Sequence, residues 1–295
     1  KNVWIGTDPG GIVIYQRKNA VFTNLKNSPN NSSTISSNSI YKIRQTPDMM
    51  WVSVYPTGVD VYKKFKGRFK AITSAGNQGK CLNQKSVLSI VEAPSGQILF
   101  GTDGGGINMY NSKNQNIIYH KDSKSVGLPL FIKCMNFDGK QNLWVGTWAK
   151  GLWVFDSKMN VVKNFPNVQS VEDPTVLSSN IGSVLTDTKN KTWVGLLSKG
   201  MVSYEENEKL FMNKNSLFFN DLKNAITIKK IFQDKQGNIW VGTEQTGVVV
   251  MKSNDNKIMK FTSEINDTNT LCDNNINDIF QANDGSLWFC THGGL

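Results

Sequence analysis

Six polar or aromatic residues could bind a ligand, and they fall in short segments between apolar runs. Trp148 is followed two residues later by Lys150. An exposed indole offers its flat face to the C–H surface of a sugar ring, and a nearby ammonium group can meet hydroxyls or an acidic group. Corresponding segments elsewhere carry Lys199, Tyr55, Asp103 and Glu244. These six residues predict a ligand-binding surface, and their chemistry favours carbohydrate. The alternative interpretation is that Trp148 folds over its own sheet and only packs there.

The sequence makes a weaker case for catalysis or metal binding. The acids that could serve an enzyme fall mostly near predicted turns, where Asp bonds local backbone: Glu92, Asp138, Asp187, Asp234 and Asp278. Only two histidines occur, His120 and His292, and the four cysteines include no Cys-x-x-Cys pair. No nucleophile elbow, zinc-protease motif or phosphate-binding loop is present. We therefore expect no catalytic residue, no metal site and no cofactor.

The candidate residues are positioned by a repeat. The phrase Trp240-Val241-Gly242-Thr243 recurs in related forms every 45 to 49 residues. The first residues of these phrases, here called anchors, are Trp4, Trp51, Leu99, Trp144, Trp193, Trp240 and Trp288. A glycine stands seven residues after most anchors, and a Tyr, Phe or Met stands eleven residues after them. Seven copies of such a period indicate a repeat architecture.

Each repeat predicts four short strands. Aliphatic pairs such as Ile228 and Ile231 mark strand 1, and the anchor phrase is a continuous apolar run typical of a covered strand 2. The glycine at plus seven allows the hairpin to strand 3, and strand 4 is a looser outer strand. Four strands in about 45 residues, repeated, are typical of a β-propeller blade. The fold class is thus all-β, a β-propeller of four-stranded antiparallel blades.

The strand count predicts seven blade positions. Strands 2 to 4 of one blade come first, five complete blades follow, and strands 1 and 2 of another end the chain. This amounts to six full blade equivalents plus an incomplete blade. No linker interrupts the repeat, so residues 1–295 are expected to form one propeller domain. Both ends fall inside a repeat, which suggests a piece of a longer protein.

The periodic indoles and the candidate residues have different expected roles. Because the anchor tryptophans return with the blade, we expect them to pack between neighbouring sheets. The candidates lie instead in the hairpin between strands 2 and 3, here called the 2–3 tip. In a propeller these tips emerge on the same face as the links from strand 4 to the next strand 1. Trp148 is surplus to the anchor pattern, which makes it the strongest candidate.

The net charge of +10 indicates which classes of partner the chain could attract. It comes from 33 basic and 23 acidic residues that are scattered along the chain. Such a balance serves solubility or attracts an anionic partner, for example an acidic saccharide. No nucleic-acid-binding signature accompanies it, so no nucleic acid is expected. No apolar run approaches the roughly 20 residues that a membrane helix needs.

The repeat resembles a known family. The phrase Leu143-Trp144-Val145-Gly146-Thr147, then Gly151-Leu152 and Phe155, together with Leu177-Ser178-Ser179-Asn180-Ile181, is similar to the regulator propeller repeats in the sensor region of bacterial hybrid two-component systems. The resemblance covers essentially all of the chain. It implies a periplasmic region of an inner-membrane receptor, with further propeller and immunoglobulin-like domains and a histidine kinase elsewhere in the protein. It also implies an oligosaccharide ligand, but it assigns no ligand residues.

These observations predict an extracytoplasmic sensor propeller without catalytic activity of its own. It would bind a saccharide released from a polysaccharide, and further domains of the same receptor, or a second copy in a homodimer, would be its protein partners. Two alternatives remain open: a polysaccharide lyase or lactone hydrolase built on a propeller, and a protein–protein scaffold.

Overall fold

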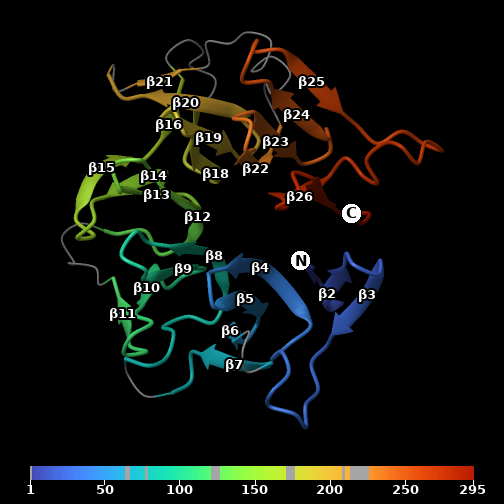
Figure 1. Ribbon diagram of the computed structural model, residues 1–295. Helices are drawn as coiled ribbons and strands as arrows, with labels where there is room; N and C mark the ends of the chain where they lie inside the picture. Colours follow the sequence, from blue (N-terminus) through green and yellow to red (C-terminus); the bar gives the residue numbers. More distant parts are fainter. Residues whose placement is uncertain are drawn as a thin grey trace. The chain divides into compact units, whose positions relative to one another are not determined.

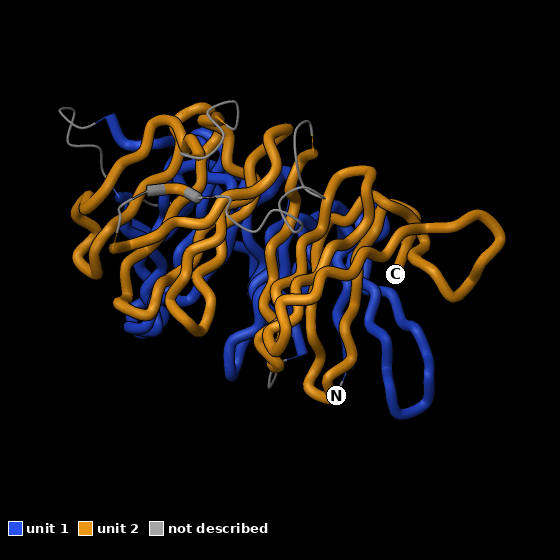
Figure 2. The backbone as a smooth tube through the Cα atoms, turned by 90° about the horizontal axis from the view of Figure 1, so that it is seen from above, with its two compact units in different colours: residues 1–133 blue, residues 134–295 orange. Residues whose placement is uncertain are grey.

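The computed structural model describes residues 2–63, 67–76, 79–120, 127–170, 177–207, 210–212 and 226–295. The regular structure of these residues consists of β-strands in small antiparallel sheets, without a helix. The chain divides into two compact units, residues 1–133 and residues 134–295, which Figure 2 colours separately.

Unit 1 contains three sheets whose strands follow one another in sequence (Figure 1). The first is three-stranded: β1 (Val3–Thr7), β2 (Gly11–Gln16) and β3 (Val21–Leu25). The second is four-stranded: β4 (Ser39–Gln45), β5 (Met49–Tyr55), β6 (Gly58–Lys63) and β7 (Arg68–Thr73). The third is β8 (Val87–Glu92), β9 (Ile98–Thr102), β10 (Ile107–Tyr110) and β11 (Ile117–Tyr119).

Unit 2 continues the same pattern, and its first strand begins at the boundary. Its four-stranded sheets are β12 (Ile132–Phe137), β13 (Leu143–Thr147), β14 (Leu152–Phe155) and β15 (Val161–Phe165); β18 (Ile181–Thr186), β19 (Thr192–Leu196), β20 (Met201–Glu205) and β21 (Leu210–Met212); and β22 (Ile228–Gln233), β23 (Ile239–Thr243), β24 (Val248–Met251) and β25 (Ile258–Phe261). The last sheet pairs β26 (Ile276–Gln281) with β27 (Leu287–Thr291). A short ladder of β16 (Val168–Gln169) and β17 (Leu177–Ser178), which the repeat did not predict, lies in the link after β15.

The predicted division into blades is confirmed. The first sheet holds strands 2 to 4, five complete four-stranded sheets follow, and the last sheet holds strands 1 and 2. The anchor phrases form strand 2 of each sheet, and β9, β13, β19 and β23 are buried along their whole length. A strand covered on both faces selects a mostly apolar sequence, and the few polar residues in the buried phrases, such as Ser53, are small and buried.

The anchor tryptophans pack against the next sheet, as predicted. The Trp51 ring lies 5.1 Å from that of Tyr110, and the Trp144 ring lies 5.3 Å from that of Tyr204. In each pair the tyrosine is the plus-eleven residue of the following repeat. The anchor indoles are buried from Trp51 to Trp240 and half-buried in the terminal sheets.

The glycine of the anchor phrase lets neighbouring sheets approach closely. A Cβ atom on Gly242 would stand 2.7 Å from Cγ2 of Ile276 in the next sheet, and one on Gly195 would collide with Ile228 in the same way. These two isoleucines begin strand 1 of the following sheet. The phrase Trp-Val-Gly-Thr is thus a packing motif: the indole and the valine fill the space between sheets, and the glycine admits the facing isoleucine.

The 2–3 tips are fixed to the links. The plus-seven glycine has a positive φ in each tip, for example 68° at Gly151. Its N–H donates to a carbonyl of the link to the next sheet, as from Gly151 to Ser179 (2.8 Å) and from Gly247 to Asn274 (2.9 Å). The tip and the link therefore lie at the same end of the blade, as predicted.

Candidate functional site

All six sequence-predicted residues lie at the 2–3 tips. Trp148, Lys150, Lys199 and Glu244 belong to unit 2, and Tyr55 and Asp103 belong to unit 1. Trp148 is 53% exposed, and Lys150 is exposed beside it. The second residue of this tip, Ala149, has a φ of 64°, a left-handed conformation that turns the chain sharply between the two candidates.

One asparagine joins the tip of Trp148 to that of Lys199. Oδ1 of Asn180 accepts a hydrogen bond from Ala149 N (2.8 Å), and the Asn180 carbonyl accepts one from Leu197 N (3.1 Å). An asparagine just before a strand usually bonds local backbone. Instead the side chain of Asn180 reaches the tip of the preceding sheet, because the link that carries it runs beside that tip. The structure thus brings the segments of Trp148, Lys150 and Lys199 together.

Thr227 makes the same kind of connection to the next tip. Its hydroxyl accepts from Ser198 N (3.1 Å) and its carbonyl accepts from Glu244 N (2.9 Å). Glu244 also forms an ion pair with Lys229 (3.4 Å). Three successive tips of unit 2 are therefore held in register by hydrogen bonds from their backbone N–H groups to the side chains and carbonyls of Asn180 and Thr227. They present an indole, ammonium groups and a carboxylate at one end of the sheets.

In unit 1 the structure adds a residue that sequence reasoning missed. Tyr55 stacks on Tyr41 with ring centroids 5.4 Å apart and an interplanar angle of 19°. The two tyrosines are 45% and 44% exposed. Tyr41 lies early in strand β4, where no repeat of the pattern marks it. The signal available in the sequence was an aromatic residue at an outward position of strand 1, next to the buried Ile40.

Acids at the tips of unit 1 act electrostatically on this tyrosine pair. Partial burial raises the pKa of Tyr41, and the proximity of Asp8, Tyr55 and Asp103 raises it further. Asp8 is held by a hydrogen bond from the Ser39 hydroxyl to its Oδ1 (2.6 Å). Both units thus expose aromatic rings beside charged groups at their 2–3 tips, an arrangement that can stack a sugar ring and bond its hydroxyls.

Two further properties bear on the chemistry of this surface. In the part of the chain that the structure describes, no cluster of three or more His, Cys, Asp or Glu side chains could hold a metal ion. Within the same ranges, no helix has the length and hydrophobicity that crossing a membrane would need.

Two segments of the chain match a known family of propeller repeats. Residues 221–245 and residues 270–293 match the two-component regulator propeller family. The second matched segment covers β26, β27 and the link before them, and the first ends two residues after β23.

Solved structures share the fold of the whole chain. The extracellular domain of a putative hybrid two-component system from B. thetaiotaomicron is 18% identical with a TM-score of 0.64, over 98% of this chain and 42% of that one. PorZ, a surface component of the type-IX secretion system of Porphyromonas gingivalis, is 16% identical with a TM-score of 0.71, over 99% of this chain and 43% of that one. The predicted β-propeller class is therefore confirmed.

A curated relative is much longer than this chain. Histidine kinase P4 of Formosa agariphila is 26% identical over 198 residues, which are 65% of this chain and 14% of that protein. The chain thus spans less than half the length of each of these three proteins.

Proposed function

We propose that this regulator propeller chain is the extracytoplasmic, ligand-sensing part of a two-component receptor, and that it has no catalytic activity of its own. Three findings support the proposal: the family match, the fold shared with the extracellular domain of a putative hybrid two-component system, and the likeness to a protein named a histidine kinase. The kinase would lie elsewhere in the receptor. Further receptor domains, or a second copy in a homodimer, would receive the signal.

The proposed ligand is a saccharide released from a polysaccharide. The observation that carries this step is the indole of Trp148, exposed at a 2–3 tip that Asn180 joins to the tip of Lys199. An exposed aromatic ring near ammonium groups, on a tip whose backbone is bonded to Asn180, suits carbohydrate better than it suits an apolar ligand. Lys150, Lys199 and Glu244 would bond the hydroxyls, and Tyr55 and Asp103 would contribute in unit 1.

The test is thermal stabilisation by a panel of oligosaccharides, followed by titration of those that raise Tm. Trp148→Ala should weaken binding by about tenfold or more, because one good aromatic contact is worth about 1.5 kcal/mol beyond burial and tenfold corresponds to 1.4 kcal/mol. Its stability should change by less than about 0.5 kcal/mol, as at other exposed positions.

Phe22→Ala is the matched control, because it removes an exposed ring (61%) from the outer strand β3. Its affinity should equal that of the wild type. Loss of stability with intact affinity in Trp148→Ala would make Trp148 a packing residue. Failure of every saccharide to raise Tm would favour the scaffold alternative, and turnover of a saccharide would favour the lyase.

A further inference from the structure

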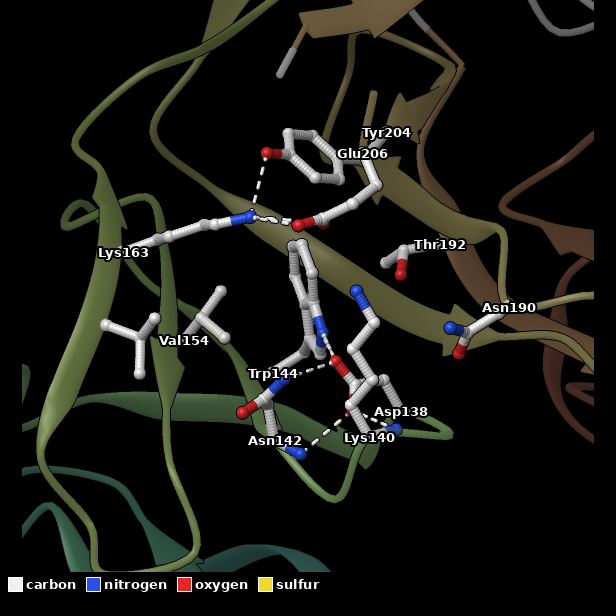
Figure 3. A pocket seen from close by; sticks show the side chains of 11 residues that line it. Asp138, Lys140, Asn142, Trp144, Val154, Lys163, Asn190, Thr192, Tyr204 and Glu206 are labelled. Carbon is white, nitrogen blue, oxygen red and sulfur yellow. Dashed lines mark hydrogen bonds and ion pairs between the residues drawn. The ribbon is translucent and has the colours of Figure 1, made fainter. Parts of the chain in front are cut away.

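A pocket opens at the end of the sheets opposite to Trp148. It lies in unit 2 between the β12–β15 sheet and the β18–β21 sheet, at their 1–2 and 3–4 turns (Figure 3). Its volume is about 90 Å³. The indole of Trp144 and the side chains of Val154 and Val162 form its apolar wall, and Lys140, Lys163, Asn190, Tyr204 and Glu206 supply polar groups. We name it the Trp144 pocket.

The acceptors in the Trp144 pocket are already satisfied. Oδ1 of Asp138 accepts from the backbone N–H groups of Lys140 (2.9 Å) and Asn142 (2.8 Å), and its Oδ2 accepts from Asn142 Nδ2 (3.0 Å) and Trp144 Nε1 (2.9 Å). Both carboxylate oxygens of Glu206 lie 3.0 Å from Nζ of Lys163. Neither acid is left needing a donor from a ligand.

Donors, in contrast, remain directed into the pocket. In Figure 3 the Lys140 side chain rises beside Trp144 with its amine toward the pocket, and the amide nitrogen of Asn190 faces it from the other sheet. Asn190 has this orientation because its Oδ1 accepts from Gly139 N (3.0 Å). The Tyr204 hydroxyl accepts from Lys163 (3.0 Å), which leaves its own proton for another acceptor.

The Lys163 ammonium keeps its charge in this setting. Burial lowers the pKa of Lys163, but its hydrogen bonds to Tyr204 and Glu206 and the negative charge of Glu206 outweigh that effect, so the pKa is raised above its ordinary value. The ammonium also lies 4.9 Å from the centroid of the Tyr204 ring. The far wall of the pocket therefore consists of Lys163, Tyr204 and Glu206, and the lysine is already bonded to the other two.

Comparison of the repeats shows why the space exists beside Trp144. Beside Trp193, Lys191 lies 5.0 Å from the indole centroid and pairs with Glu205 (2.7 Å). Beside Trp240, Lys252 lies 5.6 Å from the indole centroid. At Trp144 the residues in these two places are Asn142 and Asp156, which are short and bonded elsewhere. The lysine that covers the indoles of Trp193 and Trp240 is thus missing beside Trp144, and the pocket lies there instead.

We propose that the Trp144 pocket binds one carboxylate group. An excess of donors with satisfied acceptors selects an oxyanion, and the valines and the indole suit the carbon that carries it. The volume of about 90 Å³ is small beside the about 300 Å³ or more of pockets for drug-sized ligands, so the pocket suits one small group. The rest of an acidic molecule would stay outside. This inference does not depend on the proposed function, since the pocket and Trp148 lie at opposite ends of the sheet.

The test follows the ¹H–¹⁵N resonance of the Trp144 indole, assigned with Trp144→Phe, during titration with sodium glucuronate and with glucose. Glucuronate should shift this resonance and glucose should not. Lys140→Met should weaken glucuronate binding by about tenfold, the loss expected for one charge-assisted hydrogen bond. Lys189→Met is the matched control: Lys189 holds the same turn position before Trp193, with the same bond from its N–H to the turn aspartate, Asp187 (2.9 Å). It should bind within about twofold of the wild type, by the usual effect of an exposed substitution.

A second variant tests whether the acid binds in the pocket or is only attracted to the positive charge of the surface. Asn142→Lys restores the lysine of the next repeat, which should fill the pocket and abolish the shift although it adds a positive charge. Acetate serves to identify the source of the carboxylate: an equal response to acetate indicates any small acid, and a stronger response to glucuronate indicates an acidic saccharide. No shift with either acid, a shift with sulfate alone, or equal losses in Lys140→Met and Lys189→Met would overturn the proposal.

Discussion

Asp60 is a buried acid that accepts two hydrogen bonds from Ser36. Its Oδ2 accepts from Ser36 N (2.6 Å) and its Oδ1 accepts from the Ser36 hydroxyl (2.9 Å). Burial raises the pKa of Asp60 more than these two bonds lower it. In the next sheet the same place is held by Asn108, whose Oδ1 accepts from Asn83 N (3.0 Å). The site therefore accommodates a neutral amide, and the charge of Asp60 costs stability.

This linkage predicts a pH-dependent effect of Asp60→Asn. A raised folded-state pKa means that the folded protein binds more protons than the unfolded chain, so the aspartate favours folding at low pH and opposes it as pH rises through the folded pKa. The variant should therefore gain Tm relative to the wild type between about pH 4, near the unfolded pKa, and pH 7. A gain of about 1 kcal/mol corresponds to about 2–4 °C in a chain of this size.

Asp156→Asn is the control of opposite sign. Hydrogen bonds from the side chain and backbone of Asn160 lower the pKa of Asp156, so its charge favours folding at neutral pH and that contribution is lost in acid. Its substitution should lower Tm more at pH 7 than at low pH. Parallel Tm curves for Asp60→Asn and the wild type across this range would show that Asp60 titrates alike in both states.

At the scale of the element, Trp193 tests the packing of one blade on the next. The indole is 3% exposed, its Nε1 donates to Oδ2 of Asp187 (2.9 Å), and it packs with Met251 of the following sheet. Trp193→Ala should lower the free energy of unfolding by about 3–5 kcal/mol, measured by urea denaturation. Trp193→Phe should lower the free energy of unfolding by less, because it keeps an aromatic ring in this place. Some loss should remain, because phenylalanine lacks the N–H donor. A loss in Trp193→Ala no larger than that in Trp148→Ala would contradict the packing role.

Most of the element pattern could be predicted because it follows from periodicity. Burial on both faces of strand 2 favours an apolar phrase, and the positive φ at plus seven favours glycine. The strands of each repeat can therefore be predicted from its sequence. What could not be predicted depends on contacts between repeats. The reach of Asn180 to the preceding tip and the stacking of Tyr41 on Tyr55 arise only when links and strands are placed in space. The Trp144 pocket has a signal in the sequence: its repeat has Asn142 and Asp156 at the two places where the Trp193 and Trp240 repeats each have one lysine. That signal could be interpreted only once the position of the indole was known.

At the scale of the molecule, the repeat fixes the architecture, and the residues that vary between repeats distinguish one end of the sheets from the other. Positions that agree between repeats, such as the anchors, pack the sheets. Positions that differ carry the exposed chemistry: the 2–3 tips hold Trp148 and Tyr55, and the opposite turns hold Lys140. The assignment of residues 1–295 to one domain and of the six tip residues to ligand binding stays a prediction.

The net charge of +10 gives the last prediction, which concerns the whole surface. If the positive excess serves an anionic saccharide, a uronate-bearing oligosaccharide should bind more tightly than a neutral one of equal length. Raising the ionic strength from about 0.01 M to about 0.15 M shortens the screening length from about 30 Å to about 8 Å. The affinity for the acidic oligosaccharide should then fall, because salt screens its attraction to lysines that lie further away than the screening length. The affinity for the neutral one should stay constant. Calorimetric titration at several salt concentrations measures both, and equal affinities with equal salt responses would leave solubility as the role of the charge.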